Sequence, residues 1–351
     1  MSFVIGREEG PGAGPTGQLG TYRALDGSAG APLYLDLDGP HAMLVVGKRG
    51  YGKSYTLGVV AEALARTPGV APVVVDPMGV FSTLDDPADG EPVPAEVVTT
   101  PRVDPGALDP RSWCALVGLD PGGGPGGLVW QAARQVDSLP AMRRAIAATD
   151  APGPDRRAAD NHLALAASWG VFGADGLDAT RLGSSRVTVL DLSGLADAPM
   201  NAVARAVGEG LYRSRVTGDL DRLPWLLVDE AHTFFGGVAG ATLNRILTRG
   251  RAPGVSLGLA TQRPGAIPAA GVSQSDLLCT HRLTARGDIE ALRAARPTYM
   301  KGSLTDRMPT EPGAVLVVDD ATETVHTALV RRRATPHGGD SPRASDSAAG
   351  D

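Results

Sequence analysis

The chain has 351 residues, of which 42% are hydrophobic and 21% are charged. This composition predicts a soluble globular protein with one large or two ordinary domains. A net charge of −6 argues against an overall positive field, so any contact with nucleic acid is expected to be local. No apolar run reaches the roughly 18 residues of a membrane span, and the N-terminus shows no signal-peptide pattern. We therefore expect a cytoplasmic protein without a membrane partner.

Cysteine and histidine usage argues against a metal centre built from these residues. The two cysteines, Cys114 and Cys279, are far apart and give no metal-binding spacing, so they are expected to be free thiols. The six histidines show no ligand spacing either. Nuclease chemistry therefore finds no support in the sequence.

Apolar runs alternate with helical patterns along most of the chain, which predicts an α/β fold with a mostly parallel sheet flanked by helices. Residues 1–32 contain a glycine- and proline-rich stretch and are predicted to be a flexible segment. The main domain is predicted over 33–333, with a helical insertion at about 86–185, and 334–351 are predicted to be a disordered tail. The predicted strands are 33–38, 42–46, 71–76, 186–193, 223–230, 254–260, 276–283 and 313–318, and the predicted helices are 55–65, 128–148, 155–170, 200–215 and 240–249.

The run from Gly47 to Ser54 matches the phosphate-loop pattern G-x-x-x-x-G-K-[ST], and it lies between a predicted strand and a predicted helix. Its glycines let successive backbone N–H groups face phosphate oxygens, and the helix N-terminus adds partial positive charge. Lys53 is one of only three lysines in a chain that otherwise uses arginine. We expect Lys53 to bind the β- and γ-phosphates of ATP and Ser54 to ligate Mg²⁺. The residues predicted to hold the nucleotide are Gly47, Arg49, Gly50, Tyr51, Gly52, Lys53, Ser54 and Tyr55.

Carboxylates and an amide follow other apolar strands. Asp229 ends the predicted strand 223–230 and is expected to hold Mg²⁺, while Glu230 is expected to orient and deprotonate the attacking water. Taken alone, this acidic pair also fits an ordinary polar turn at a strand end. Gln262 follows the strand 254–260 and is a candidate sensor of the γ-phosphate.

Asp76 and Asp191 also end strands, and we interpret them as rim residues of the nucleotide crevice rather than catalytic groups.

Five stretches occur in an order that resembles the HerA branch of the HerA/FtsK superfamily. They are His41–Gly47, Asp76-Pro77-Met78-Gly79, Val189–Ser193, Val228-Asp229-Glu230-Ala231-His232 and Ala260-Thr261-Gln262-Arg263-Pro264. The resemblance covers roughly 33–330, and its more specific parts are the Thr-Gln-Arg-Pro stretch and the His-Arg-Leu stretch at 281–283. It implies a RecA-like P-loop core, a hexameric ring, ATP hydrolysis at subunit interfaces and translocation on double-stranded DNA, in some settings beside a partner nuclease.

The resemblance also implies an arginine donated by the neighbouring subunit to offset charge on the γ-phosphoryl group. Arg251 is the first choice and Arg249 the second, and the alternative is that both are solvated surface residues. One departure concerns the N-terminal β-barrel of the family. Too few residues precede Gly47 to form a barrel of about 100 residues, so the full barrel is expected to be missing.

Two functions remain open from the sequence. The first is an ATP-driven motor on DNA with helicase-like activity, in DNA processing or phage defence. The alternative is an ATP-dependent regulatory or assembly subunit that acts on a partner protein, which the acidic net charge favours slightly. A protein that binds nucleotide without turnover is disfavoured by Glu230 and Gln262.

Overall fold

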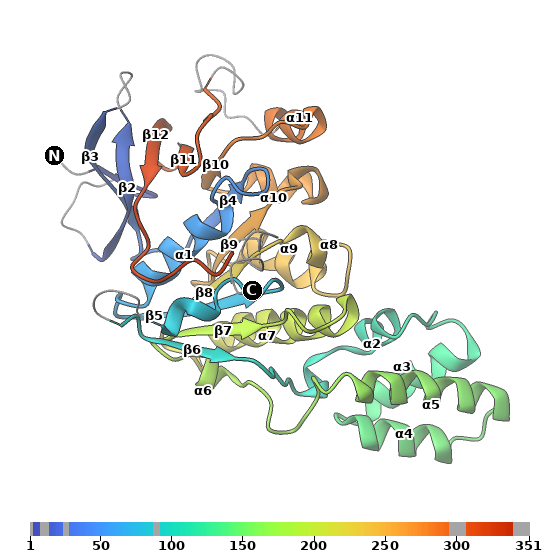
Figure 1. Cartoon of the computed structure of the whole chain (residues 1–351). Coiled ribbons are helices and arrows are strands. Elements are labelled where there is room, and N and C mark those ends of the chain that lie inside the picture. The colour runs from blue at the N-terminus through green and yellow to red at the C-terminus, as the bar shows by residue number, and fades with distance from the viewer. Residues whose placement is uncertain (1–2, 8–13, 24–27, 87–91, 295–306, 340–351) are drawn as a thin grey trace, which may run out of the picture.

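The computed structural model describes residues 3–7, 14–23, 28–86, 92–294 and 307–339. Within these residues a single sheet of twelve strands lies between helical layers, which confirms the predicted α/β class (Figure 1). The strands are β1 (Phe3–Ile5), β2 (Thr16–Arg23), β3 (Ala29–Asp36), β4 (Ala42–Val46), β5 (Val70–Asp76), β6 (Ala95–Val98), β7 (Val187–Asp191), β8 (Leu223–Val228), β9 (Ser256–Thr261), β10 (Leu277–Thr280), β11 (Ala314–Asp319) and β12 (Thr324–Val330). The α-helices are α1 (Lys53–Leu64), α2 (Pro110–Leu116), α3 (Gly124–Gln135), α4 (Leu139–Ala148), α5 (Gly153–Ser168), α6 (Ala179–Leu182), α7 (Asp197–Thr217), α8 (His232–Phe235), α9 (Gly240–Arg249), α10 (Ala269–Ser273) and α11 (Arg286–Ala294).

The sheet has a parallel part and an antiparallel part. Its order is β1-β3-β2-β12-β11-β10-β4-β9-β8-β5-β7-β6, and the strands from β10 to β6 are all parallel. Strand β9 lies between β4 and β8, and it pairs Thr261 with Val46 and Leu259 with Val228. Because parallel strands share one direction, the loops that follow β4, β8 and β9 meet at the same edge of the sheet.

Both faces of the parallel strands are buried, which explains their nearly continuous apolar sequences. Along β4, Met43 and Val45 belong to the core on the face that α1 covers, while Leu44 and Val46 belong to the core under α7 and α9. Successive side chains of β4 therefore pack into opposite layers. Contacts on both faces hold this strand, and with it the start of the phosphate loop, in place.

Helices α2 to α5 pack on one another and project from the end of the sheet, as the green elements of Figure 1 show. They occupy most of the predicted insertion at 86–185. Strand β6 lies in the same range but pairs with β7 in the sheet, so residues 95–98 belong to the core layer. Residues 87–91 lie outside the described part of the chain.

The prediction of a flexible segment at 1–32 is wrong for the strands that the structure describes there. Strand β2 pairs with β12 and β3, and β1 pairs with β3. The glycines that suggested flexibility serve packing instead: a Cβ at Gly17 would lie 2.5 Å from the Cβ of Ala63 on α1. Residues 1–2, 8–13 and 24–27 lie outside the described part.

The prediction of a disordered tail at 334–351 is wrong for 334–339. After β12 the chain runs across α1, and Thr335 is buried there. Its backbone N–H and its hydroxyl both donate to Glu62 of α1, at 3.0 and 2.8 Å. Sequence periodicity could not predict that this segment is ordered, because the segment is held by the carboxylate of Glu62, which is distant in sequence. Residues 340–351 lie outside the described part.

Candidate functional site

The loop between β4 and α1 forms an anion site. Gly50 and Gly52 have φ angles of 80° and 108°, which residues with a side chain rarely adopt. Gly47 is required for close packing, because a Cβ there would lie 2.6 Å from Cβ of the buried His281. Gly52 is the N-cap of α1 and provides no side-chain hydrogen bond, so N–H groups of the first turn can bind an anion.

Lys53, Ser54 and Asp229 meet at this loop although Asp229 is distant in sequence. Lys53 is buried, and burial lowers the pKa of its ammonium group, while nearby Glu230 and Asp229 oppose that shift. The Ser54 hydroxyl donates to Oδ2 of Asp229 at 2.8 Å. Burial raises the pKa of Asp229 to about 6, and its second oxygen, Oδ1, has no hydrogen-bond partner. A buried carboxylate oxygen without a partner, beside a serine hydroxyl, suits a hard cation.

Glu230 stands next to this group in an unusual backbone conformation. Its φ angle is 42°, in the left-handed region that costs energy for a residue with a side chain. The backbone N–H of Gln262 lies close enough to its carboxylate to favour the ionised form and so to oppose a raised pKa. Its Oε2 lies 3.3 Å from Nδ1 of His232 in a geometry that makes no hydrogen bond. Burial raises the pKa of Glu230, and the positive charges of Lys53 and Arg263 oppose that shift. The carboxyl group is therefore near a cation and short of hydrogen-bond donors.

The sensor strand contributes two residues. Gln262 follows β9 and lies beside Glu230 through its backbone, as its position in the sequence led us to expect. Its neighbour Arg263 lies close enough to influence the titration of Glu230 and His232. Sequence reasoning quoted Arg263 only as part of a motif and assigned it no role. Its place directly after Gln262 is the signal that could have identified it.

The loop and the acidic pair share one cavity of about 490 Å³. The predicted residues that line it are Arg49, Gly50, Gly52, Lys53, Ser54, Tyr55, Asp229 and Glu230. Tyr51 instead packs beside Lys48, whose Nζ is 4.5 Å from the centre of its ring. Part of the wall comes from His337 and Gly339, which sequence reasoning missed.

The two candidate finger arginines lie away from this cavity. Arg249 ends α9, Arg251 lies in the turn before β9, and both are exposed. Arg251 lines a separate cavity of about 190 Å³ together with His41 and Asp276, which precede β4 and β10. Since the phosphate loop follows β4, Arg251 belongs to the opposite edge of the parallel sheet. The structure therefore does not bring either arginine to the phosphate loop of its own chain.

Two further buried residues support the site. His281 lies under the phosphate loop, where Nδ1 donates to the carbonyl of Ala314 at 2.9 Å and Nε2 is 2.9 Å from the Thr56 hydroxyl. Burial lowers its pKa to about 4. Asp76 accepts hydrogen bonds from the backbone N–H groups of Met78 and Phe81, so it shapes the turn after β5. Burial and the neighbouring Asp229 raise the pKa of Asp76 to about 6.

The sheet order, the phosphate loop and the adjoining carboxylates define a RecA-like P-loop ATPase. Residues 18–125, which include the loop, match the family model of the central domain of the helicase HerA. Over these residues the chain is similar to the HerA central domain, which agrees with the resemblance indicated by the motifs. No curated protein sequence matches it significantly.

Solved structures share the fold at low sequence identity. VirB4 of Thermoanaerobacter pseudethanolicus is 16% identical with a TM-score of 0.68, and the match covers 92% of this chain and 98% of that one. The plasmid coupling protein TrwB in complex with ADP and Mg²⁺ is 14% identical with a TM-score of 0.60, covering 94% and 98%. The bacterial conjugative coupling protein TrwBΔN70 is 13% identical with a TM-score of 0.56, covering 86% and 87%. These matches confirm the RecA-like architecture.

Two kinds of feature are absent from the described residues. No helix in that part of the chain combines the length and the apolar character needed to span a membrane. No group of three or more His, Cys, Asp or Glu side chains in the same residues is arranged to hold a metal ion.

Proposed function

We propose that the chain hydrolyses ATP with Mg²⁺ and uses the energy to move along double-stranded DNA as a hexameric ring. The observation that carries the hydrolytic part is the placement of Glu230 beside Lys53 and Asp229 in one cavity. The HerA family match supports the motor part. A role in DNA processing beside a partner nuclease, or in phage defence, is the finer expectation.

The site's own residues account for binding. Backbone N–H groups at the start of α1 face the phosphates, and Lys53 adds a buried positive charge for the β- and γ-phosphates. Ser54 and Asp229 are the residues that would hold Mg²⁺, with the remaining ligands from phosphate oxygens and water. When bound, this ion neutralises charge that develops on the phosphates. Asp229 Oδ1 makes no hydrogen bond, so this oxygen is available to ligate the ion.

The same geometry supplies a base. A water oxygen attacks the γ-phosphorus, the bond to the bridging oxygen of ADP breaks, and the Glu230 carboxylate takes the proton of the water. Burial raises the pKa of Glu230, which makes its carboxylate a stronger base, while the positive charge of Lys53 favours the ionised form. Arg263 and Arg49 lie within electrostatic reach of that carboxylate and add to the positive field. In our proposal Gln262 senses the γ-phosphate, and Arg251 or Arg249 completes the site of a neighbouring subunit.

The decisive experiment measures ATP hydrolysis with and without linear duplex DNA. We expect duplex to stimulate the wild type, and Glu230→Gln to lower kcat by at least about 100-fold while ATP binding is retained. Glu290→Gln is the matched control, because Glu290 pairs with Arg286 on an exposed face of α11 and should leave activity unchanged. Hydrolysis that no DNA alters would contradict the motor and support the alternative, an ATP-dependent subunit acting on a partner protein.

A further inference from the structure

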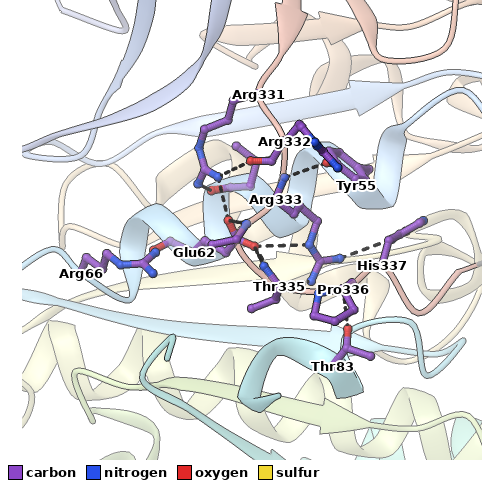
Figure 2. A network of polar contacts seen from close by, with 12 residues as sticks. Tyr55, Glu62, Arg66, Thr83, Arg331, Arg332, Arg333, Thr335, Pro336 and His337 are labelled. Atoms are coloured by element: carbon purple, nitrogen blue, oxygen red, sulfur yellow. Dashed lines mark hydrogen bonds and ion pairs between the residues drawn. The ribbon is translucent and has the colours of Figure 1, made fainter. Parts of the chain in front are cut away.

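The chain that follows β12 returns to the helix of the phosphate loop. Residues 331–339 cross α1, as Figure 2 shows, and end beside the nucleotide cavity. Because α1 begins at the phosphate loop, anything docked on this helix is positioned relative to the phosphates. We call residues 331–339 the C-terminal strap.

A single buried carboxylate anchors the strap. Glu62 of α1 is fully buried and accepts hydrogen bonds from Arg331 Nη1 at 2.8 Å and from the backbone N–H groups of Ala334 and Thr335, both at 3.0 Å. Arg333 Nε approaches the same carboxylate at 3.5 Å, and the Arg333 side chain is itself buried. A buried charge with this many donors is satisfied only when the strap is in place. The docking is therefore specific.

The strap carries an aromatic side chain to the cavity wall. The backbone N–H of Arg333 donates to the Tyr55 hydroxyl at 2.7 Å, and Tyr55 directly follows Ser54. The rings of Tyr55 and His337 meet edge to face with centroids 5.4 Å apart. Arg333 Nη1 lies 3.3 Å from Nδ1 of His337, which orients the imidazole further. His337 thus has a fixed position relative to the phosphate loop.

The cavity is lined by two chemically different sets of side chains. Lys53, Ser54 and Asp229 belong to the polar set, where the phosphates are expected. The lining also includes apolar and aromatic side chains outside the phosphate loop, and these are Met78, Val80, Leu329, Val330 and His337. Met78 is 59% exposed, so its thioether is accessible from the cavity. An imidazole and a thioether in a partly open cavity suit the flat face of a heterocycle.

We propose that the C-terminal strap forms the base-binding wall of the nucleotide site, with His337 and Met78 contacting the purine of ATP. The inference rests on the proposed binding of ATP at the phosphate loop. Its consequence is reciprocal: docking of the strap on Glu62 favours nucleotide binding, and a bound base stabilises the docked strap. Inorganic tripolyphosphate, which lacks a base, gains nothing from the strap.

The test compares the binding of ATP and of tripolyphosphate, each with Mg²⁺, to the full chain by calorimetry. We expect His337→Ala to weaken ATP binding about 10-fold, the scale of one base–aromatic contact, and to leave tripolyphosphate binding unchanged. His337→Phe keeps a flat ring and should restore most of the loss. His162→Ala is the matched control, because His162 lies on α5 of the helical projection, where its Nδ1 donates to the Val117 carbonyl at 2.8 Å.

Several results would overturn the assignment. If His337→Ala binds ATP as the wild type does, the strap is no base-binding wall. An equal loss for both ligands would place the effect at the phosphate loop instead. If the wild type binds neither ligand, the proposed nucleotide function itself fails, which the other two results leave intact.

A second measurement needs no substitution. Arg332 is exposed between the buried parts of the strap, so trypsin reaches it when the strap lifts from α1. We expect ATP to slow cleavage after Arg332, followed by mass spectrometry, whereas saturating tripolyphosphate should not. Equal protection by both ligands would contradict a contact with the base.

Discussion

At Glu230 the proposed catalytic role and the stability of the backbone compete. Its φ angle of 42° is one that glycine tolerates better, yet the chain keeps a glutamate there. The side chain is only partly buried, but its Oε2 atom is buried and makes no hydrogen bond. Both features cost stability and both are expected of a group reserved for a substrate water. The backbone conformation and the unpartnered oxygen of Glu230 therefore support the hydrolytic reaction that we propose for the cavity.

His281 gives a prediction about pH. Its folded-state pKa of about 4 lies below the ordinary value of 6.5, so between these values the unfolded chain binds more protons than the folded chain. Stability should therefore fall as the pH drops from about 6.5 to 4. We expect the wild type to lose about 3 kcal/mol more than His281→Gln over this window, measured by urea unfolding at several pH values.

Wild type must be compared with His281→Gln because other groups change stability in the opposite direction as the pH falls. The pKa values of Asp76 and Asp229, both about 6, are raised above the ordinary value. Protonation of these two residues therefore stabilises the folded state as the pH falls, in wild type and variant alike. Their contribution cancels in the difference. Identical pH dependence in wild type and variant would show that His281 does not titrate in this window.

At the scale of elements, α7 connects the helical projection to the sheet. Arg205 of α7 is buried and donates to the Thr242 hydroxyl at 3.0 Å, to the Val238 carbonyl at 3.1 Å and to Asp109 at 2.5 Å. Asp109 is the N-cap of α2 and accepts from the backbone N–H of Ser112. One guanidinium group thus joins α7, the region before α9 and the start of the projection.

We expect Arg205→Met to reduce the free energy of unfolding by about 3 kcal/mol, because one buried and two partly buried hydrogen bonds lose their donor. Urea unfolding followed by circular dichroism measures this change. Arg213→Met is the control on the same helix. The Arg213 side chain is 66% exposed, and its ion pair with Glu209 is long, at 4.0 Å. Its substitution should change stability by less than about 0.5 kcal/mol. Equal effects of the two substitutions would contradict a connecting role for Arg205.

At the scale of the whole molecule, the two edges of the parallel sheet carry different groups. The phosphate loop and the acidic pair lie where the strands end, and Arg251 lies where they begin. An arginine at the far edge can act only on the site of another copy. The arrangement supports the proposed ring, because each copy then offers a site at one edge and an arginine at the other.

Mixing variants tests this arrangement. Arg251→Ala should retain an intact phosphate loop but lack the donated arginine, while Lys53→Ala should lack the loop's charge but keep the arginine. We expect each protein alone to lose nearly all ATP hydrolysis and a mixture to recover a measurable fraction. The same pair of assays with Arg249→Ala decides between the two arginines. Full activity of both arginine variants on their own would remove them from the mechanism.

The sequence alone determined the parallel core and the phosphate site, because the signals for them are local. An uninterrupted motif identified Gly47 to Ser54, and each functional carboxylate or amide directly follows an apolar strand. Residues that follow neighbouring parallel strands lie at the same edge of the sheet. The sequence alone therefore allowed Asp229 and Gln262 to be assigned to one site.

Only the tertiary structure decided the remaining parts, because they depend on partners far away in the sequence. Strand β2 has glycines where a strand pattern needs apolar residues, and it is recognised only by its pairing with β12 and β3. The C-terminal strap has no periodicity, since its order comes from one carboxylate, Glu62, buried on α1. Local patterns report how a segment folds by itself, whereas a buried charge and its donors exist only once the chain has brought them together.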